Sequence, residues 1–101
     1  MHKRTKATAI TPKTRQIVEE RDGGCCIFCG RLGRGEGHFI KRSQGGLGIE
    51  QNLITVCREC HHQMDDGFSR ELYLLKAESY LKRHYPGWNK ADLVYKKGCD
   101  T

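Results

Sequence analysis

The sequence predicts a small α+β domain in which helices flank a short two-stranded centre and cysteines staple the fold. Two Cys-x-x-Cys pairs enclose residues 30–56, and a β-branched apolar segment stands immediately before the second pair. Helical patterns precede and follow the enclosed region. Only 37% of the 101 residues are hydrophobic, so the core is thin and a covalent or metal staple is expected to stabilise it.

The N-terminal part predicts an arm followed by a helix. Residues 1–10 are polar and basic without periodicity, which predicts a flexible basic arm. Thr11-Pro12 suits the start of a helix, because the hydroxyl can cap a backbone N–H and proline needs no partner at the first helical position. We expect this helix over residues 13–21, with Ile17 and Val18 as its apolar contacts.

The central part predicts two short strands joined by a long loop. Residues 37–40 suit the first strand, and residues 41–51 contain three glycines, which predict irregular structure. Residues 52–56 carry the clearest strand signal of the chain, since they are compact, apolar and β-branched. A helix is expected over residues 60–66, ending at Gly67.

The C-terminal part predicts a longer helix and a segment that packs back against it. Ser69 suits the N-cap of a helix over residues 70–84, and Pro86-Gly87 ends it. Trp88 and residues 93–95 are expected to pack onto its wide apolar face. The expected members of that face are Leu72, Tyr73, Leu74, Leu75, Ala77, Tyr80 and Leu81.

Length and composition fit a single domain over residues 1–101. We divide it into the arm, a stapled core over residues 20–66 and a helical extension over residues 69–95. No secretory leader and no apolar run of about 18 residues is visible, so we expect a cytoplasmic protein without a membrane partner. The net charge of +6 suits a nucleic-acid partner, although a merely basic protein would show the same charge.

The cysteine pairs allow a metal site or disulfides. In a reducing compartment, paired Cys-x-x-Cys motifs bind zinc more often than they form disulfides. A redox dithiol is the weaker alternative, because it would want a single pair that opens a helix in a βαβ unit. We therefore expect structural zinc bound by Cys26, Cys29, Cys57 and Cys60, with Cys25 and Cys99 as spare thiols.

A longer ordered pattern surrounds these cysteines. It consists of Gly37-His38-Phe39-Ile40, Arg42-Ser43, Gly45-Gly46, Asn52-Leu53-Ile54 and Cys57-x-x-Cys60-His61. Over about residues 20–66 this pattern resembles the HNH endonucleases, and the two cysteine pairs resemble their zinc-stapled branch, which is common in bacteriophage genomes. The resemblance implies the ββα-metal (His-Me finger) fold and a DNA endonuclease that acts by nicking. It also suggests phage packaging or recombination proteins as partners.

The resemblance implies a role for each polar residue of the pattern. His38 would be the base that polarises the attacking water, and imidazole suits this because it titrates near neutral pH. Asn52 would hold the loop and thereby His38 in position. His61 and Asp65 are four residues apart on one helical face and can bind one divalent ion, for which Mg²⁺ or Mn²⁺ is expected.

One position departs from the commonest pattern of the family. Many members carry Asp or His immediately before the base as a further metal ligand, whereas this chain has Gly37. Glu36 shares the strand face of His38 and can substitute as a ligand. Phosphate contacts are expected from the nearby cations Lys41, Arg42 and Arg58.

A non-catalytic zinc module that binds DNA or a protein is the other interpretation. In that case His38 and His61 have no chemical role and Mg²⁺ has no effect, whereas the four cysteines are needed under both interpretations. Biological role, sequence specificity and oligomeric state are left open by the sequence.

Overall fold

The computed structural model describes residues 3–96 and is built around a two-stranded antiparallel sheet. Strand β1 (Arg34–His38) pairs with strand β2 (Leu53–Val56), and helix α3 (Arg58–Asp66) follows β2 almost directly. This β1–β2–α3 order is the ββα arrangement that the resemblance implies. The predicted α+β class with flanking helices is confirmed.

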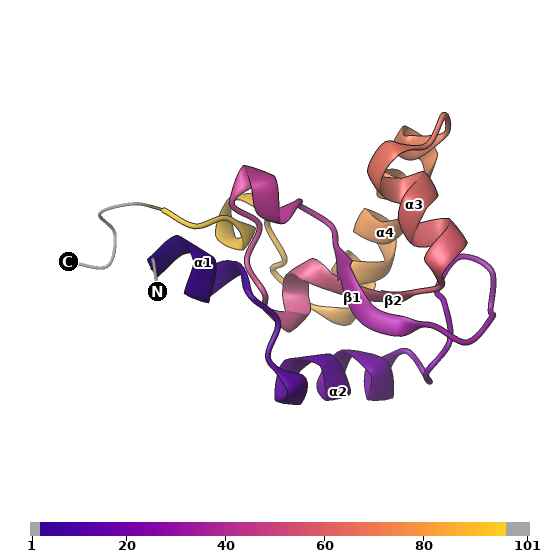
Figure 1. Ribbon diagram of the computed structural model, residues 1–101, viewed down its shortest axis with the longest axis horizontal. Coiled ribbons are helices and arrows are strands. Elements are labelled where there is room, and N and C mark those ends of the chain that lie inside the picture. Colours follow the sequence, from indigo (N-terminus) through magenta and orange to yellow (C-terminus); the bar gives the residue numbers. More distant parts are fainter. Residues whose placement is uncertain (1–2, 97–101) are drawn as a thin grey trace.

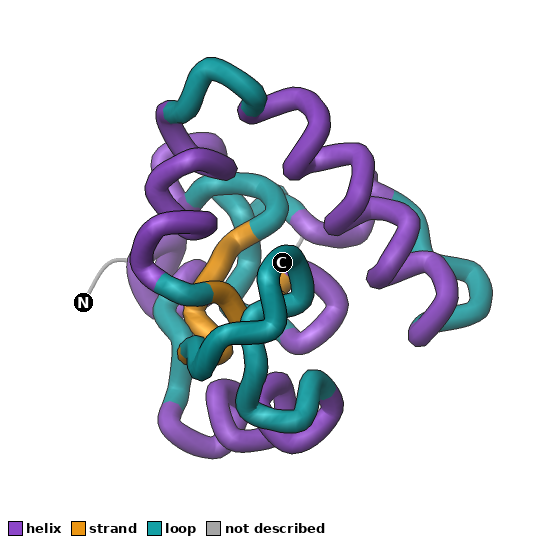
Figure 2. The backbone as a smooth tube through the Cα atoms, turned by 90° about the vertical axis from the view of Figure 1, so that its right-hand side faces the viewer, coloured by secondary structure: helices purple, strands orange, loops and turns teal. Residues whose placement is uncertain are grey.

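The other helices lie on both sides of this unit. Helix α2 (Pro12–Arg21) packs on one side of the sheet through the fully buried Val18, whereas α3 and helix α4 (Arg70–His84) lie on the other side (Figure 1). Figure 2 shows the two strands near the centre of the surrounding helices and loops. Among the described residues, no helix is both long enough and apolar enough to cross a membrane.

Helix α1 (Lys3–Thr8) is the first difference from expectation, because it forms where we expected an irregular arm. The side-chain hydroxyl of Thr8 donates back to the carbonyl oxygens of Arg4 and Thr5. Thr8 itself is only 3% exposed, so the end of α1 is packed into the domain. This packing depends on contacts with distant residues, and a local sequence pattern does not reveal them.

The predicted start of α2 is confirmed, whereas one of its predicted contacts is wrong. The hydroxyl of Thr11 accepts a hydrogen bond from the backbone N–H of Thr14 at 3.1 Å, and Pro12 is the first helical residue. Val18 is buried as expected, but Ile17 is 39% exposed. The two residues are adjacent on a helix, and only one of them faces the sheet.

The strands are displaced slightly from their predicted bounds. Strand β1 runs from Arg34 to His38 rather than over residues 37–40, with a bulge between Arg34 and Gly37. The loop between the strands contains short 3₁₀ helices over Arg42–Gln44 and Glu50–Asn52. Helix α3 begins two residues earlier than expected, because Cys57 acts as its N-cap, and it ends at Gly67 as predicted.

Helix α4 has the predicted bounds, but its apolar face is narrower than expected. Ala77 and Leu81 are buried, whereas Leu72 and Leu75 are 62% and 63% exposed. Ser69 precedes the helix without a side-chain capping bond. The following segment packs back as predicted, since Leu93 joins Ala77 and Leu81 in one buried apolar cluster.

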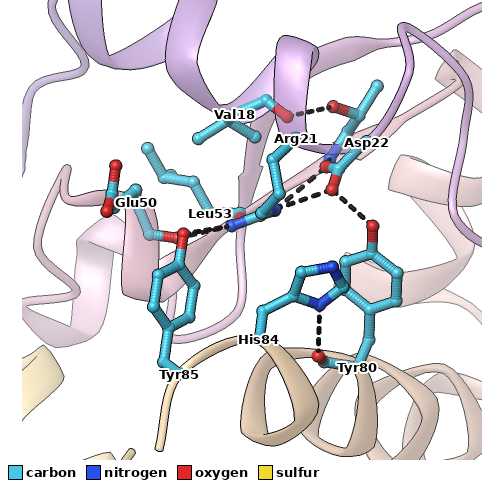
Figure 3. Close-up of polar contacts among 9 residues, drawn as sticks. Val18, Arg21, Asp22, Glu50, Leu53, Tyr80, His84 and Tyr85 are labelled. Carbon is cyan, nitrogen blue, oxygen red and sulfur yellow. Dashed lines mark hydrogen bonds and ion pairs between the residues drawn. The ribbon is translucent and has the colours of Figure 1, made fainter.

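A polar network that the sequence did not predict joins α2 to β2 and α4 (Figure 3). The carboxylate of Asp22 accepts two hydrogen bonds from Arg21, one from the Tyr80 hydroxyl at 2.6 Å and one from the backbone N–H of Thr55 at 2.8 Å. Arg21 also donates to the carbonyl oxygens of Glu50 and Leu53 and to the Tyr85 hydroxyl. The side chains of Arg21 and Asp22 are 10% and 0% exposed, so this ion pair is almost fully removed from water.

We expect Asp22→Asn to lower the free energy of unfolding by about 3–5 kcal/mol, because it leaves a buried guanidinium without its counter-charge. Burial raises the pKa of Asp22, but the hydrogen bonds from Arg21 and Tyr80 outweigh it and hold this pKa below its usual value. The stabilisation is therefore present above pH 3.8 and is lost as the pH falls through the lowered pKa. Urea unfolding followed by circular dichroism measures the change.

The matched control is Glu78→Gln, which removes the carboxylate that pairs with Lys82 and Lys90 near the surface. This substitution is expected to cost at most about 1 kcal/mol, because water screens exposed pairs. Equal losses in the two variants would contradict the importance of the buried network.

Candidate active site

The four predicted zinc ligands lie together in one cluster. Their sulfur atoms are all within 4.8 Å of one another, and the Sγ atoms of Cys29 and Cys57 are 3.6 Å apart. A tetrahedral zinc ion with bonds of about 2.3 Å places its sulfur ligands about 3.8 Å apart, so the geometry fits. Among residues 3–96, no other group of three or more histidine, cysteine or acidic side chains is gathered this closely. The cluster consists of Cys26, Cys29, Cys57 and Cys60.

Two tight backbone turns present these sulfur atoms. In the first pair, Gly30 adopts a left-handed φ of 80° and donates its N–H to the carbonyl oxygen of Cys26. In the second pair, the Cys57 sulfur caps α3 by accepting the N–H of Cys60, and this bond lowers the pKa of Cys57 to about 7. Burial and the neighbouring thiols raise the pKa of Cys60. Four thiolates at this spacing therefore need a dication among them.

Cys25 and Cys99 are the two cysteines outside the predicted ligand set. Cys25 is half-buried and is not part of the cluster, although it adjoins Cys26. Its backbone forms an isolated bridge with Leu32 instead. Cys99 lies outside the described residues. The four-residue ligand set thus excludes Cys25, as its spacing predicted.

An open cleft of about 570 Å³ lies between β1, the following loop and α3. Residues 9 and 10, Arg15 and Asp66 contribute to its walls. Six of the predicted site residues also line it, and the fold therefore brings them together from two separate segments of the chain, residues 36–42 and α3. They are Glu36, His38, Lys41, Arg42, His61 and Asp65.

His38 stands at the end of β1 with its ring largely buried. It is 8% exposed, and its Nε2 lies 3.0 Å from the carbonyl oxygen of Thr8. A carbonyl oxygen can only accept, so Nε2 carries the proton and the lone pair is on Nδ1. Burial and the charge of Arg42 lower the pKa of His38, although the Thr8 carbonyl opposes them. The imidazole is therefore neutral near pH 7 and can take up a proton.

His61 and Asp65 form a polar pair on α3, which lines the same cleft as His38. The Nε2 of His61 lies 3.3 Å from an Asp65 carboxylate oxygen, one helical turn away, and each side chain is about one third exposed at 33% and 34%. The predicted shared face of these residues is confirmed. An imidazole and a carboxylate in this arrangement offer two ligands to a divalent ion and leave its other positions to water or phosphate oxygens.

Asn52 lies outside the cleft and is fully buried, with 0% exposure. Its side-chain oxygen accepts the N–H of Ile40 at 2.9 Å, and its amide donates to the carbonyl oxygens of Ile40 and Leu47. These bonds connect Ile40 and Leu47, in the loop that follows His38, to the start of β2. The contacts suit the positioning role implied for this residue.

Gly37 and Glu36 occupy different environments on β1. A Cβ atom at Gly37 would lie 3.0 Å from a methyl group of Val56 and 3.2 Å from Ile54, so this position faces the packed side chains of β2. Glu36 instead lines the cleft with His38 and forms an ion pair of 3.8 Å with Arg15. In this chain, the acidic group that lines the cleft beside His38 on β1 therefore comes from Glu36.

The predicted phosphate contacts divide between two neighbouring grooves. Lys41 and Arg42 line the cleft, and Lys41 also pairs with Asp66 at 3.6 Å. Arg58 lies instead in an adjacent groove together with Arg34. Both grooves include Glu36 and His61, so cations flank these two residues on both sides.

Two contributors to the site were not found from the sequence. Thr8 bonds to His38 through its backbone carbonyl across 30 residues of sequence, and such a contact leaves no side-chain signal. Arg15 reaches Glu36 from α2. Its position seven residues before Asp22 carried no recognisable pattern, although its charge is of the kind expected around a phosphate.

Comparison with known proteins agrees with this geometry. Residues 26–67 match the family model described as HNH endonuclease. The matched segment contains both cysteine pairs, both strands and α3, and the resemblance drawn from the sequence is confirmed over it. No curated protein and no solved structure matches the chain.

Proposed function

We propose, from the match of residues 26–67 to the HNH endonuclease family, that the protein is a metal-dependent DNA endonuclease that nicks one strand. The observation that carries the proposal is His38. It is buried and held by one nitrogen, and its lone pair is on the other nitrogen, in a cleft shared with His61 and Asp65. A neutral imidazole in one cleft with two side chains that can bind a divalent ion suits metal-assisted phosphodiester hydrolysis.

In the proposed reaction, Nδ1 of His38 accepts a proton from a water molecule as the water attacks the phosphorus atom. The N–H at Nε2 stays bonded to the Thr8 carbonyl, which stabilises the imidazolium that forms. His61 and Asp65 would hold a Mg²⁺ or Mn²⁺ ion, with Glu36 able to add a ligand directly or through water. Such an ion would supply positive charge at the leaving 3′-oxygen, which takes a proton from solvent water to become the 3′-hydroxyl. Family resemblance implies products with a 3′-hydroxyl and a 5′-phosphate.

The surrounding cations are proposed to position the DNA backbone. Lys41 and Arg42 border the cleft, whereas Arg58 lies in the adjacent groove. Contacts of this kind hold phosphates without reading bases, so weak sequence preference is expected. A phage origin and packaging or recombination partners stay predictions from the resemblance.

One observation favours the alternative of a non-catalytic zinc module. Among the described residues, no three histidine or acidic side chains of the cleft are gathered as closely as the four cysteines, since the cleft offers a divalent ion only the contacting pair of His61 and Asp65, and Gly37 stands where many relatives have a ligand. In that alternative the zinc cluster and the cations bind DNA or a protein without hydrolysis. Dependence on the second metal separates the two functions.

We expect His61→Ala to lower the nicking rate by at least about 10²-fold, because the proposed ion loses one of its two side-chain ligands. Supercoiled plasmid is incubated with wild type and variant in Mg²⁺, Mn²⁺ or neither, and relaxed product is quantified. The fold should be retained, since His61 is not among the zinc ligands.

His62→Ala is the matched control, because His62 is exposed on the same helix and does not line the cleft. It should nick at close to the wild-type rate. A wild type that shows no activity with either metal would support the non-catalytic alternative.

A further inference from the structure

Helix α1 lies outside the segment that matches the HNH family, yet it contributes the sole hydrogen-bond partner that the structure gives to the His38 ring. We propose that α1 is a positioning element for the catalytic imidazole, so that the active site of this chain is complete only when α1 is docked on the loop after β1. This inference rests on the proposed function, because it assigns α1 a role in the same reaction.

The end of α1 explains why the Thr8 carbonyl is available. The last four carbonyl groups of a helix have no partner within the helix and must find one elsewhere. The N–H of Ala9 takes the carbonyl of Thr5 at 3.1 Å, and the Thr8 carbonyl accepts from His38 at 3.0 Å. The Thr8 carbonyl and the His38 N–H are therefore each other's hydrogen-bond partners in a buried setting, where an unpaired donor or acceptor is costly.

Four further contacts attach α1 to the loop after β1. The N–H of Gly48 donates to the carbonyl of Ala7 at 3.0 Å, and Arg4 donates to the carbonyl oxygens of Ser43 at 2.8 Å and Arg42 at 3.3 Å. Arg42 reaches the hydroxyl of Thr8 at 3.4 Å. Helix α1 is thus attached to the same loop that Asn52 attaches to the start of β2. This loop directly follows His38.

The closest approach is at Gly48. A Cβ atom there would lie 2.1 Å from the carbonyl oxygen of Ala9 and 2.6 Å from its carbonyl carbon. Both are backbone atoms, so they cannot yield by a change of rotamer. Only glycine lets the two chain segments lie this close, and a methyl group would push the end of α1 away from the loop.

Removing α1 from its place would change the chemistry of His38 in a defined way. With the Thr8 carbonyl as acceptor, the proton stays on Nε2, and the orientation of the ring and of the Nδ1 lone pair is fixed. Without it, both tautomers are available and the ring can rotate. A displacement of about 1 Å in a catalytic group can cost about 10²-fold in rate.

The test uses the full chain with its zinc and the variant Gly48→Ala. Long-range ¹H–¹⁵N NMR of the His38 ring should show a single Nε2–H tautomer in the wild type and a mixture in the variant. In plasmid nicking, kcat should fall at least tenfold while KM for DNA changes by less than about threefold, because base positioning and not binding is affected.

Two further variants keep the result interpretable. Arg4→Gln weakens the attachment of α1 to the loop without a steric clash, and it should shift the His38 tautomer and kcat in the same direction as Gly48→Ala. It therefore tests the role of α1 even if Gly48→Ala does not fold. Ala77→Gly weakens the buried part of α4 at a residue that does not line the cleft, and it should lower stability while leaving the tautomer and kcat unchanged.

The tautomer measurement does not depend on catalysis. A wild type that fails to nick DNA, yet shows the Nε2–H tautomer that Gly48→Ala disturbs, would overturn the proposed function and leave the positioning contact standing. Folded Gly48→Ala and Arg4→Gln proteins that keep the wild-type tautomer and kcat would overturn the role of α1.

Discussion

Cys57→Ser is expected to unfold the domain, because it removes one of the four sulfur atoms of the zinc cluster, although the serine hydroxyl can still cap α3. A structural zinc site contributes about 10–16 kcal/mol at pH 7 to the folding of small domains, more than a thin core can replace. The variant should lose its cooperative thermal transition in circular dichroism. Metal analysis by mass spectrometry should show no bound zinc at concentrations where the wild type is loaded.

Cys25→Ser provides the control, since Cys25 adjoins the cluster in sequence but is not one of its ligands. Its melting temperature and zinc content should equal those of the wild type. If Cys57→Ser melted at the wild-type temperature, the zinc staple would be refuted, and if Cys25→Ser also lost zinc, the assignment of Cys26 would need revision.

His38→Gln is expected to lower the nicking rate by about 10²–10⁴-fold, the usual contribution of general-base catalysis. A glutamine side chain keeps an N–H group that can donate to the Thr8 carbonyl, but it has no lone pair that can take a proton at neutral pH. The variant should therefore stay folded while losing turnover. Single-turnover nicking in Mg²⁺, with a thermal melt of the same protein, measures both properties.

His84→Gln is the matched substitution at an exposed histidine of α4, and it should retain wild-type turnover. His38→Ala adds a test of the hydrogen bond, because it leaves the Thr8 carbonyl without its partner and should melt at a lower temperature than His38→Gln. Nicking by His38→Gln at the wild-type rate would remove His38 from the role of base.

The parts of the fold that the sequence predicts are those governed by neighbouring residues. The Thr11-Pro12 start of α2, the bounds of α4 and the end of α3 at Gly67 follow from caps and turns, which act over a few residues. The cysteine cluster follows from spacing, since two-residue spacers place paired sulfur atoms around one metal.

What could not be predicted depends on contacts between distant segments. The docking of α1 needs backbone bonds to a loop some 40 residues away, as in the pair Ala7 and Gly48. The burial of Asp22 depends on contacts with Tyr80 and Thr55. In the sequence alone, Asp22 is recognisable only as a residue at the end of a helix. The exposure of Leu72 and Leu75 likewise depends on which face of α4 the rest of the chain covers.

The candidate site shows the same division. The shared helical face of His61 and Asp65 is a matter of helix periodicity and was predictable. The orientation of His38 was not, because a residue outside the recognised pattern supplies its partner. The environment of Gly37 also depends on the strand register, which places it against Ile54.

The adjacency of Cys60 and His61 in the first turn of α3 has a consequence for biochemistry on this protein. A zinc ligand and a proposed ligand of the second ion share one peptide bond, so losing the first metal displaces the second site immediately. Chelators that are added to stop the proposed Mg²⁺-dependent reaction should therefore act in two stages, a fast reversible arrest and a slow inactivation that Mg²⁺ alone does not reverse. Specific activity then reports the zinc-loaded fraction of a preparation.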